Sequence, residues 1–384
     1  MSDRFAIAAG RIFDGEAWHD DAALIVAEGL VEGIVERDAV PAGVTMTDGG
    51  AMLVPGFIDL QVNGGGGLML NDKPDADTLD IICKAQMPFG TTAVLPTLIT
   101  DTPEITRSTI AAGAEAAKRK MPGFLGLHLE GPHLSLSRKG AHDPKLIHPM
   151  DAAEQAALIA ARPSMPVLLT TVAPESVTVA QVKRLADAGV VVSLGHTDTS
   201  YRTAKQYAEA GASMATHLFN AMSQIGNREP GLAGAAVDIG TFSAGLIADG
   251  IHVDPATMQI ALKAKNGPAR IFLVTDAMAT IGTDLQSFQL NGRTIKRENG
   301  RLTLEDGTLA GADLDMISAI RFMHEIGYDL GEAIRMASLY PAEAVGQEKR
   351  LGRLAKGYAA NAVQLTDTLD VSGTWIDGKK VFSA

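Results

Sequence analysis

The chain has 384 residues, of which 46% are hydrophobic and 20% charged, and this size suits a barrel of roughly 250 residues with additional structure. Its formal net charge of −12 disfavours nucleic acid and anionic membranes as partners, although a local positive site can still bind an anionic small molecule. Cys83 is the only cysteine, which excludes a disulfide within the chain and fits a reducing compartment.

The start of the chain does not resemble a targeting segment. Residues 1–15 contain an acidic residue early and no apolar h-region of the kind that a secretory signal has. No apolar run approaches the roughly 20 residues that a membrane span needs. We therefore expect a cytoplasmic protein with no membrane partner.

The two ends of the chain have the same kind of sequence pattern. Residues 1–53 contain short apolar runs punctuated by Gly and Asp, without a helical period, and residues 345–384 repeat this pattern. We predict that the two ends, 1–53 and 345–384, form one small β-sandwich domain. Residues 54–344 are then left for a separate catalytic domain.

Between the ends, short apolar runs alternate with amphipathic helical segments. The helical segments 151–162, 179–189, 200–211 and 255–267 are typical, and several end at Gly. After the last run we expect a hairpin over 287–296 and 300–311, and helices over 315–327 and 330–339. About eight nearly continuous apolar runs predict an α/β fold, a (β/α)₈ TIM-like barrel of strands buried on both faces. The runs are 53–63, 91–100, 123–132, 167–175, 189–197, 214–222, 242–253 and 271–278.

Polar residues stand at the carboxyl ends of these predicted strands, where barrel active sites lie. They are Glu130, His196, His217, His252 and Asp276. Each alone is more simply a structural residue, such as a hydrogen-bonded His or an Asp that caps a helix. Five such accidents on one rim are much less plausible, so we expect a functional site there.

One carboxylate and two imidazoles suit a divalent transition metal, with zinc the first choice. Three protein ligands leave a coordination position open, which is the catalytic arrangement. Asp276 is a candidate to accept and later deliver a proton. Ligand type does not separate zinc from iron, manganese or cobalt.

Nine short motifs together resemble the N-acetylglucosamine-6-phosphate deacetylases, a branch of the amidohydrolase superfamily. They are PGFIDLQVNGGGG, HLEGPHLS, KGAH, SLGHT, THLFNAM, REPG, ADGIHV, VTDAM and LAGA, and the similarity runs over essentially the whole chain. Single motifs of this length are weak, but HLEGP, GHT and THLFNAM in this order are specific. The resemblance implies hydrolysis of N-acetyl-D-glucosamine 6-phosphate to D-glucosamine 6-phosphate and acetate, in amino-sugar catabolism.

The resemblance also implies roles for ten residues. One divalent ion per subunit would be held by Glu130, His196 and His217, and Asp276 would be the catalytic base and acid. His142 would contact the sugar near the scissile amide. The remaining substrate contacts would be Asn220, Ala221, Leu309 and the phosphate-binding pair Arg228 and His252. One of the phosphate-binding set reaches across from a neighbouring subunit in this family, which implies a homodimer.

The chain departs from many amidohydrolases at one place. Their first barrel strand ends in His-x-His, whereas here the two positions are Gln61 and Asn63. An amide is a weaker ligand than an imidazole, so we expect one metal, with a second weak site at these residues left open. His133 stands where the family often has an aromatic or apolar residue and is assigned no role. His128 is open between a structural and a supporting role.

Three alternative functions remain. A sister activity on N-acetylgalactosamine 6-phosphate differs at one sugar hydroxyl and is not separated by sequence. Hydrolases of cyclic amides or N-acyl amino acids usually keep His-x-His, which argues against them here. A non-catalytic barrel that serves as a scaffold is disfavoured by the complete set of Glu130, His196, His217 and Asp276.

Overall fold

A computed structural model describes residues 4–384. Residues 1–3, the start of the segment considered as a targeting signal and of the predicted β domain, lie outside the described residues. The chain divides into two compact units. The β unit comprises Met1–Asp59, Gln86–Ala93 and Asp315–Ala384, and the barrel unit comprises Leu60–Ala85 and Val94–Leu314. The domain boundaries at 53/54 and 344/345 stay a prediction.

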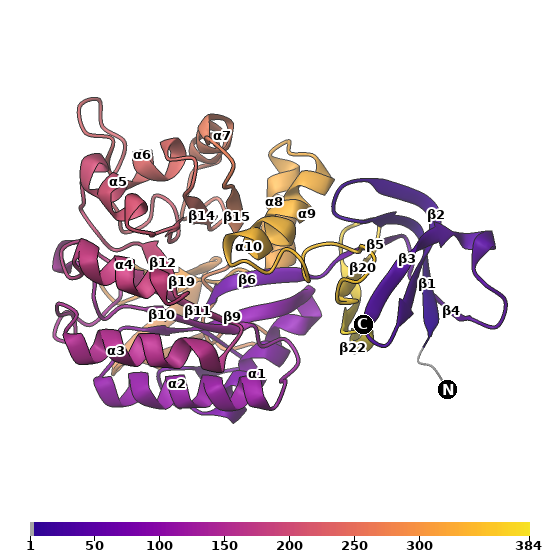
Figure 1. Ribbon diagram of the computed structural model, residues 1–384, viewed down its shortest axis with the longest axis horizontal. Coiled ribbons are helices and arrows are strands. Elements are labelled where there is room, and N and C mark those ends of the chain that lie inside the picture. Colours follow the sequence, from indigo (N-terminus) through magenta and orange to yellow (C-terminus); the bar gives the residue numbers. More distant parts are fainter. Residues whose placement is uncertain (1–3) are drawn as a thin grey trace. The chain divides into compact units, whose positions relative to one another are not determined.

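One branched sheet of the β unit joins the two ends of the chain. Its order is β22-β21-β20-β5-β1-β2-β3, and β4 pairs with β1. In Figure 1 the indigo strands from the N-terminal end lie beside the yellow strands from the C-terminal end, where β20 pairs with β5. The strands are β1 (Phe5–Phe13), β2 (Trp18–Ala27), β3 (Leu30–Glu36), β4 (Thr45–Asp48), β5 (Met52–Pro55), β20 (Ala362–Leu365), β21 (Val371–Ile376) and β22 (Lys379–Ser383).

Alternation along β1 explains the packing of this sheet. Ile7 belongs to one buried apolar cluster, and Ala6 and Ala8 belong to another, because successive side chains point to opposite faces. The same unit contains three helices, α8 (Met316–Glu325), α9 (Leu330–Ala337) and α10 (Leu339–Ala344). Asp315 and Asp329 cap the first two by accepting backbone N–H hydrogen bonds.

The barrel sheet has eight strands in the order β15-β14-β13-β12-β11-β10-β9-β6. Successive strands from β9 to β15 pair in parallel, and a parallel bridge between Val62 and Ala277 joins the two ends of the sheet. The fold class predicted from the sequence is thereby confirmed. The strands are β6 (Phe57–Val62), β9 (Thr91–Ile99), β10 (Gly126–Glu130), β11 (Val167–Val172), β12 (Val191–Leu194), β13 (Met214–Ala215), β14 (Ser243–Leu246) and β15 (Ile271–Leu273).

Helices follow most barrel strands, as the sequence pattern predicts. They are α1 (Ala76–Gln86), α2 (Pro103–Lys118), α3 (Ala152–Ala161), α4 (Val179–Asp187), α5 (Tyr201–Glu209), α6 (Gly231–Asp238) and α7 (Pro255–Ala264). Side chains of Thr102, Asp151, Thr178, Ser200 and Asp254 accept backbone N–H hydrogen bonds at the starts of five of them, which fixes where these helices begin. Within residues 4–384, no helix has the length and apolarity of a membrane span.

Two smaller sheets complete the barrel unit. The segment predicted as a hairpin forms four antiparallel strands, β16 (Ser287–Leu290), β17 (Arg293–Glu298), β18 (Arg301–Thr303) and β19 (Leu309–Ala312). β7 (Gly64–Gly65) pairs with β8 (Leu68–Met69), and their two-residue turn needs positive φ at Gly66 and Gly67. Short 3₁₀ turns occur in both units, at Arg37–Ala39 and Met87–Phe89 in the β unit and at Leu136–Arg138 and Arg162–Ser164 in the barrel unit.

Candidate active site

A cavity of about 380 Å³ lies at the carboxyl ends of the barrel strands, within the barrel unit. Five of its polar lining residues lie at or within three residues of a strand's carboxyl end, which is where a parallel barrel presents side chains to a ligand: Asn63, Glu130, His196, His217 and Asp276. Nine of the ten residues assigned roles from the sequence line this cavity: Glu130, His142, His196, His217, Asn220, Ala221, His252, Asp276 and Leu309. Arg228 is not among the lining residues.

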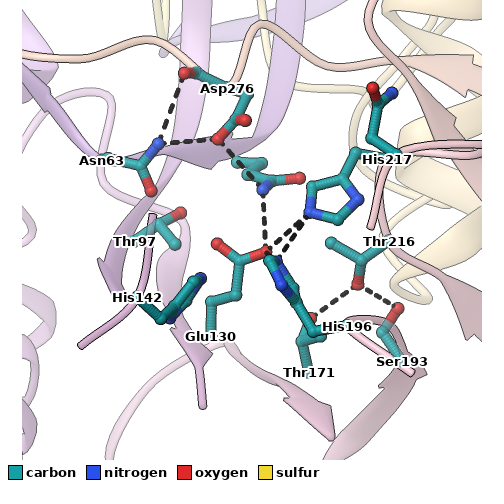
Figure 2. A network of polar contacts seen from close by, with 12 residues as sticks. Asn63, Thr97, Glu130, His142, Thr171, Ser193, His196, Thr216, His217 and Asp276 are labelled. Carbon is teal, nitrogen blue, oxygen red and sulfur yellow. Dashed lines mark hydrogen bonds and ion pairs between the residues drawn. The ribbon is translucent and has the colours of Figure 1, made fainter. Parts of the chain in front are cut away.

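Three candidate metal ligands converge in the cavity (Figure 2). Glu130 Oε1 lies 3.2 Å from His196 Nε2 and 3.1 Å from His217 Nε2, and the two Nε2 atoms are 3.0 Å apart. All three side chains are buried. An ion that bonds nitrogen and oxygen at about 2.0–2.2 Å needs donor atoms this close together. The three residues therefore fit one divalent transition-metal ion.

The hydrogen bonds of the ring nitrogens show which histidine can bind a metal ion through Nε2 and which one presents an N–H there. His196 Nδ1 lies 2.8 Å from the Arg138 carbonyl oxygen and must carry the ring hydrogen, so its Nε2 lone pair is free for a metal. His142 has the opposite tautomer, because the Thr100 N–H donates to its Nδ1 at 3.3 Å and the ring hydrogen is therefore on Nε2. A nitrogen of His142 also lies within 4.8 Å of the Glu130 and His196 ligand atoms, but its protonated Nε2 is a donor.

Burial sets the charge of His142. Removal of the ring from water, together with the neighbouring His196, lowers its pKa well below the ordinary value. The ring is therefore neutral near neutral pH. The Thr100 hydroxyl, 2.7 Å from Nδ1, adds a second contact that holds the ring in place. His142 thus presents an N–H to the cavity, which suits a substrate carbonyl oxygen.

Asp276 accepts hydrogen bonds from both amides that replace His-x-His. Its Oδ1 lies 2.7 Å from Asn63 Nδ2 (Figure 2). The same oxygen lies 3.1 Å from Gln61 Nε2, which is also 3.2 Å from Glu130 Oε1. Gln61 thus bridges two carboxylates with N–H groups instead of lone pairs. Burial, followed by the charge of Glu130, raises the pKa of Asp276 to about 6. Such a carboxyl group can both accept and return a proton near neutral pH.

His252 is held by a local acidic turn. Its Nδ1 lies 2.6 Å from Asp249 Oδ2, and Asp249 Oδ1 accepts the backbone N–H groups of Ile251 and His252. The carboxylate fixes the ring, so Nε2 is the nitrogen left for a ligand. This arrangement suits an anionic group at the wall of the cavity.

The amidohydrolase family profile matches residues 52–381, and the profile of the NagA composite domain matches residues 4–53. The chain belongs to the amidohydrolase family. Members of this family depend on metal ions, which agrees with the donor set of Glu130, His196 and His217.

Relatives of this amidohydrolase cover nearly its whole length. It is 42% identical to an N-acetylgalactosamine-6-phosphate deacetylase of Shewanella sp. (strain ANA-3), over 94% of this chain and 92% of the relative. It is 36% identical to the N-acetylglucosamine-6-phosphate deacetylase of Haemophilus influenzae, over 94% of each chain. The crystal structure of N-acetylglucosamine-6-phosphate deacetylase from Pasteurella multocida matches with a TM-score of 0.95 and 34% identity, over 99% of this chain and 100% of that one.

Arg228 of this amidohydrolase lies apart from the other candidates. It is exposed, in the loop that precedes α6, and it does not line the cavity of its own chain. Its expected role with His252 stays a prediction. The resemblance already implied that one phosphate contact comes from a neighbouring subunit, and an exposed arginine outside its own cavity is compatible with that.

Thr100 is a site residue that our sequence analysis did not single out. It directly follows β9 and sets the tautomer of His142 through its backbone and hydroxyl. The same positional signal that indicated Glu130 and Asp276, a polar residue at the carboxyl end of a barrel strand, applies to it. His128, in contrast, contacts Leu60 O and Thr171 Oγ1, and burial lowers its pKa to about 4, so it is a neutral structural residue.

Left-handed backbone conformations gather at the cavity. His196, His217 and Asp276 have φ values of 49°, 31° and 52°, and Phe219 and Ala221 have 74° and 47°. Residues with a Cβ rarely adopt this region, and each such position costs about 1–3 kcal/mol. Four of these five residues, all but Phe219, line the cavity. The surrounding barrel must hold them there.

Replacement of Asn63 is expected to change the pH dependence. Its N–H stabilises the ionised form of Asp276, so Asn63→Ala should raise the pKa of Asp276 further above its ordinary value. The acidic limb of the kcat/KM profile should move to higher pH. The matched control is Asn266→Ala, which removes an exposed amide contact with Asp238. An acidic limb that stays in place in Asn63→Ala would contradict this role.

Proposed function

We propose that this amidohydrolase removes the acetyl group from N-acetyl-D-glucosamine 6-phosphate and releases D-glucosamine 6-phosphate and acetate. The observation that carries the proposal is the close triangle of Glu130, His196 and His217, with Asp276 and His142 in the same cavity. The cavity volume of about 380 Å³ suits one phosphorylated sugar. A deacetylase from Mycobacterium smegmatis with a TM-score of 0.91 was solved as a mutant in complex with this compound.

The ion expected between Glu130, His196 and His217 is one divalent cation per subunit, with zinc favoured and iron, manganese or cobalt also compatible. Bound there, it would supply Lewis acidity toward the acetamide carbonyl and would make water a competent nucleophile near neutral pH. Gln61 places N–H groups, not a lone pair, between Glu130 and Asp276. Because a second ion would need a lone pair at this position, the arrangement supports a mononuclear site.

The residues of the chain carry the proton transfers. Asp276 accepts a proton as water attacks the carbonyl carbon, and it returns that proton to the amine nitrogen when the C–N bond breaks. The Nε2–H of His142 donates to the carbonyl oxygen, where negative charge develops. One water is consumed, and acetate and the free amino sugar are formed. The raised pKa of Asp276, about 6, suits both halves of this cycle.

The phosphate would be bound far from the amide. His252, fixed by Asp249, lines the cavity together with Asn220 and Ala221. We infer that Arg228 completes the phosphate site of a neighbouring subunit, which makes the protein a homodimer. The planar guanidinium suits phosphate oxygens, and remote binding of this kind orients the reacting group. A phosphorylated sugar does not cross a membrane unaided, so we also propose that the protein is cytoplasmic.

A complementation experiment tests the shared site. Arg228→Ala should lower the preference for the phosphorylated over the free sugar. When equal amounts of Arg228→Ala and Asp276→Asn subunits are mixed and reassociated, about half of the dimers are heterodimers, and each heterodimer contains one intact site. About a quarter of the wild-type activity should therefore be recovered. Arg350→Ala, at an exposed position of the β unit, is the matched control. An unchanged substrate preference in Arg228→Ala would remove this residue from phosphate recognition.

The proposed reaction itself is tested by measuring acetate release from both phosphorylated epimers, with metal content determined on the same sample. The glucosamine epimer should be the better substrate. The N-acetylgalactosamine 6-phosphate reaction is the second candidate, because a relative of that activity is 42% identical. A clear preference for the galactosamine epimer would overturn our assignment of the sugar. A protein that binds no metal and hydrolyses neither would be a scaffold.

A further inference from the structure

A second group of metal-compatible side chains lies outside the active-site cavity. It consists of His133 in the segment after β10, His148 before α3, and Glu154 in the first turn of α3. One ligand atom from each lies within 4.8 Å of the others. His148 Nε2 is 2.7 Å from Glu154 Oε1, and His133 Nε2 is 3.9 Å from Glu154 Oε2. None of the three lines the cavity that contains Glu130 and Asp276.

Backbone carbonyls fix the tautomers of both histidines. His133 Nδ1 lies 3.1 Å from the His148 carbonyl oxygen, and His148 Nδ1 lies 2.8 Å from the Leu146 carbonyl oxygen. A ring nitrogen that faces a carbonyl must carry hydrogen, so in each neutral ring Nε2 has the free lone pair. A backbone carbonyl on the far nitrogen is the usual support of a metal-bound histidine.

Glu154 is also held in place before any ion binds. Its Oε2 accepts the Asp151 backbone N–H at 2.9 Å, as part of the capping box that starts α3. This bond directs Oε1 toward His148. The carboxylate is therefore oriented by the helix start, and little side-chain freedom would be lost on binding a cation.

A proton alone does not satisfy the cluster. Burial opposes the charged form of His148, but the hydrogen bonds to Glu154 and the Leu146 carbonyl, together with the charges of Glu154 and Asp151, outweigh it and raise the pKa, so a proton can occupy the His148–Glu154 contact. His133 is buried, and burial lowers its pKa, so this ring stays neutral. Within residues 4–384, no hydrogen bond is formed by His133 Nε2. A cation can engage all three ligands at once.

We propose that His133, His148 and Glu154 bind a second divalent transition-metal ion, zinc by preference. Two imidazoles and one carboxylate are a known zinc donor set. The site is reachable, because the His148 side chain is 40% exposed. An apolar cavity of about 230 Å³, lined in part by His133 and Glu154, leaves space for a further small ligand.

The position of the site predicts what the ion does. His133 and His148 stand at the two ends of a segment that carries Ser137, Arg138 and His142 into the active-site cavity. An ion between these ends would close the segment into a loop tied to α3. Binding to the folded chain alone also stabilises that fold. The second ion is therefore a structural staple that positions the His142 segment.

Zinc content of the full-length protein tests this directly. After equilibration with buffered zinc and removal of excess, the wild type should hold about two equivalents per chain, and His148→Gln and His133→Phe about one. His217→Gln should also hold one, since it removes the active-site ion. His148 is on the surface, so its replacement should fold normally even if His133→Phe does not. Zinc content in His148→Gln equal to that of the wild type would overturn the proposal.

The matched control is His19→Gln. His19 Nε2 lies 2.7 Å from Asp14 Oδ2, the same kind of pair as His148 with Glu154, but without a second histidine. This variant should keep both zinc equivalents. On the His217→Gln background, zinc should slow tryptic cleavage at Arg138, Lys139 and Lys145 several-fold, and the added His148→Gln change should abolish this protection. Equal rates of cleavage with and without zinc would refute the proposed structural role of this ion.

Discussion

Asp276→Asn is expected to abolish turnover while substrate binding is kept. The amide has nearly the same shape and can still contact Gln61 or Asn63, but it neither accepts a proton from water nor delivers one to the leaving amine. General acid–base catalysis contributes about 10²–10⁴-fold, and in the proposed mechanism one residue serves both halves of the reaction. We expect kcat to fall by at least the larger of these factors. Direct binding measurements should give a Kd close to that of the wild type.

Asp254→Asn is the matched control for this change. Asp254 caps α7 by accepting the Ala256 N–H, and Asn caps a helix about as well as Asp. The same chemical substitution in the same barrel unit should therefore leave folding and kcat unchanged. If Asp276→Asn retained more than a small fraction of wild-type kcat, the proton transfers would have to be assigned to another group.

His217→Gln should cost one metal equivalent and almost all activity. It removes one of the three corners of the 3.0–3.2 Å triangle, and an amide oxygen is a weaker ligand than imidazole. Without the ion, water is a poor nucleophile at neutral pH, so we expect kcat to fall by more than about 10³-fold. Metal analysis and kcat should be measured on one preparation.

Chelation provides an independent form of this experiment. Removal of the active-site ion leaves His217 beside Glu130, whose hydrogen bond and charge raise the pKa of His217 against the effect of burial. The apoprotein should therefore take up a proton near neutral pH, and added zinc should release it and restore activity. His324→Gln, at an exposed histidine that contacts Tyr328, should change neither metal content nor kcat. Full activity in the metal-free protein would contradict the mechanism.

The sequence was informative about the rim of the barrel because two independent patterns coincide there. Strands buried on both faces appear as nearly continuous apolar runs, so a polar residue such as Glu130 or Asp276 stands out where a run ends. Parallel pairing then brings these ends to one side of the sheet whatever their separation in the chain. Glu130, His196, His217 and Asp276 consequently share one cavity.

Contacts that depend on side-chain direction were beyond such reasoning. Gln61 and Asp276 are 215 residues apart, and the bridge from Gln61 to both carboxylates follows from the closure of the barrel between Val62 and Ala277. The sequence indicated only that two imidazoles were replaced by amides. Likewise, no spacing rule links His133 and His148 with Glu154, because their approach depends on the path of the segment before α3.

The segment after the eighth strand was the least predictable part of the fold. A hairpin was expected, but residues 287–312 form four strands. The fourth strand, β19, is short and contains two small residues and a glycine, so its periodicity carries little information. The backbone after β15 determines where this strand lies. The Ala312 N–H donates to the Asp276 carbonyl oxygen, and Ala312 forms a parallel bridge with Ala277. That connection brings Leu309 to the cavity.

The left-handed residues around the cavity have a consequence for anyone who wishes to make a heat-resistant form of this protein. The simplest gains would come from relaxing those turns, for instance by glycine at His196, His217 or Asp276, and each of these changes would remove a side chain that the proposed mechanism needs. Improvement must come instead from helix ends, loops and surface charges away from the rim. Robustness and turnover therefore compete at the same few backbone positions.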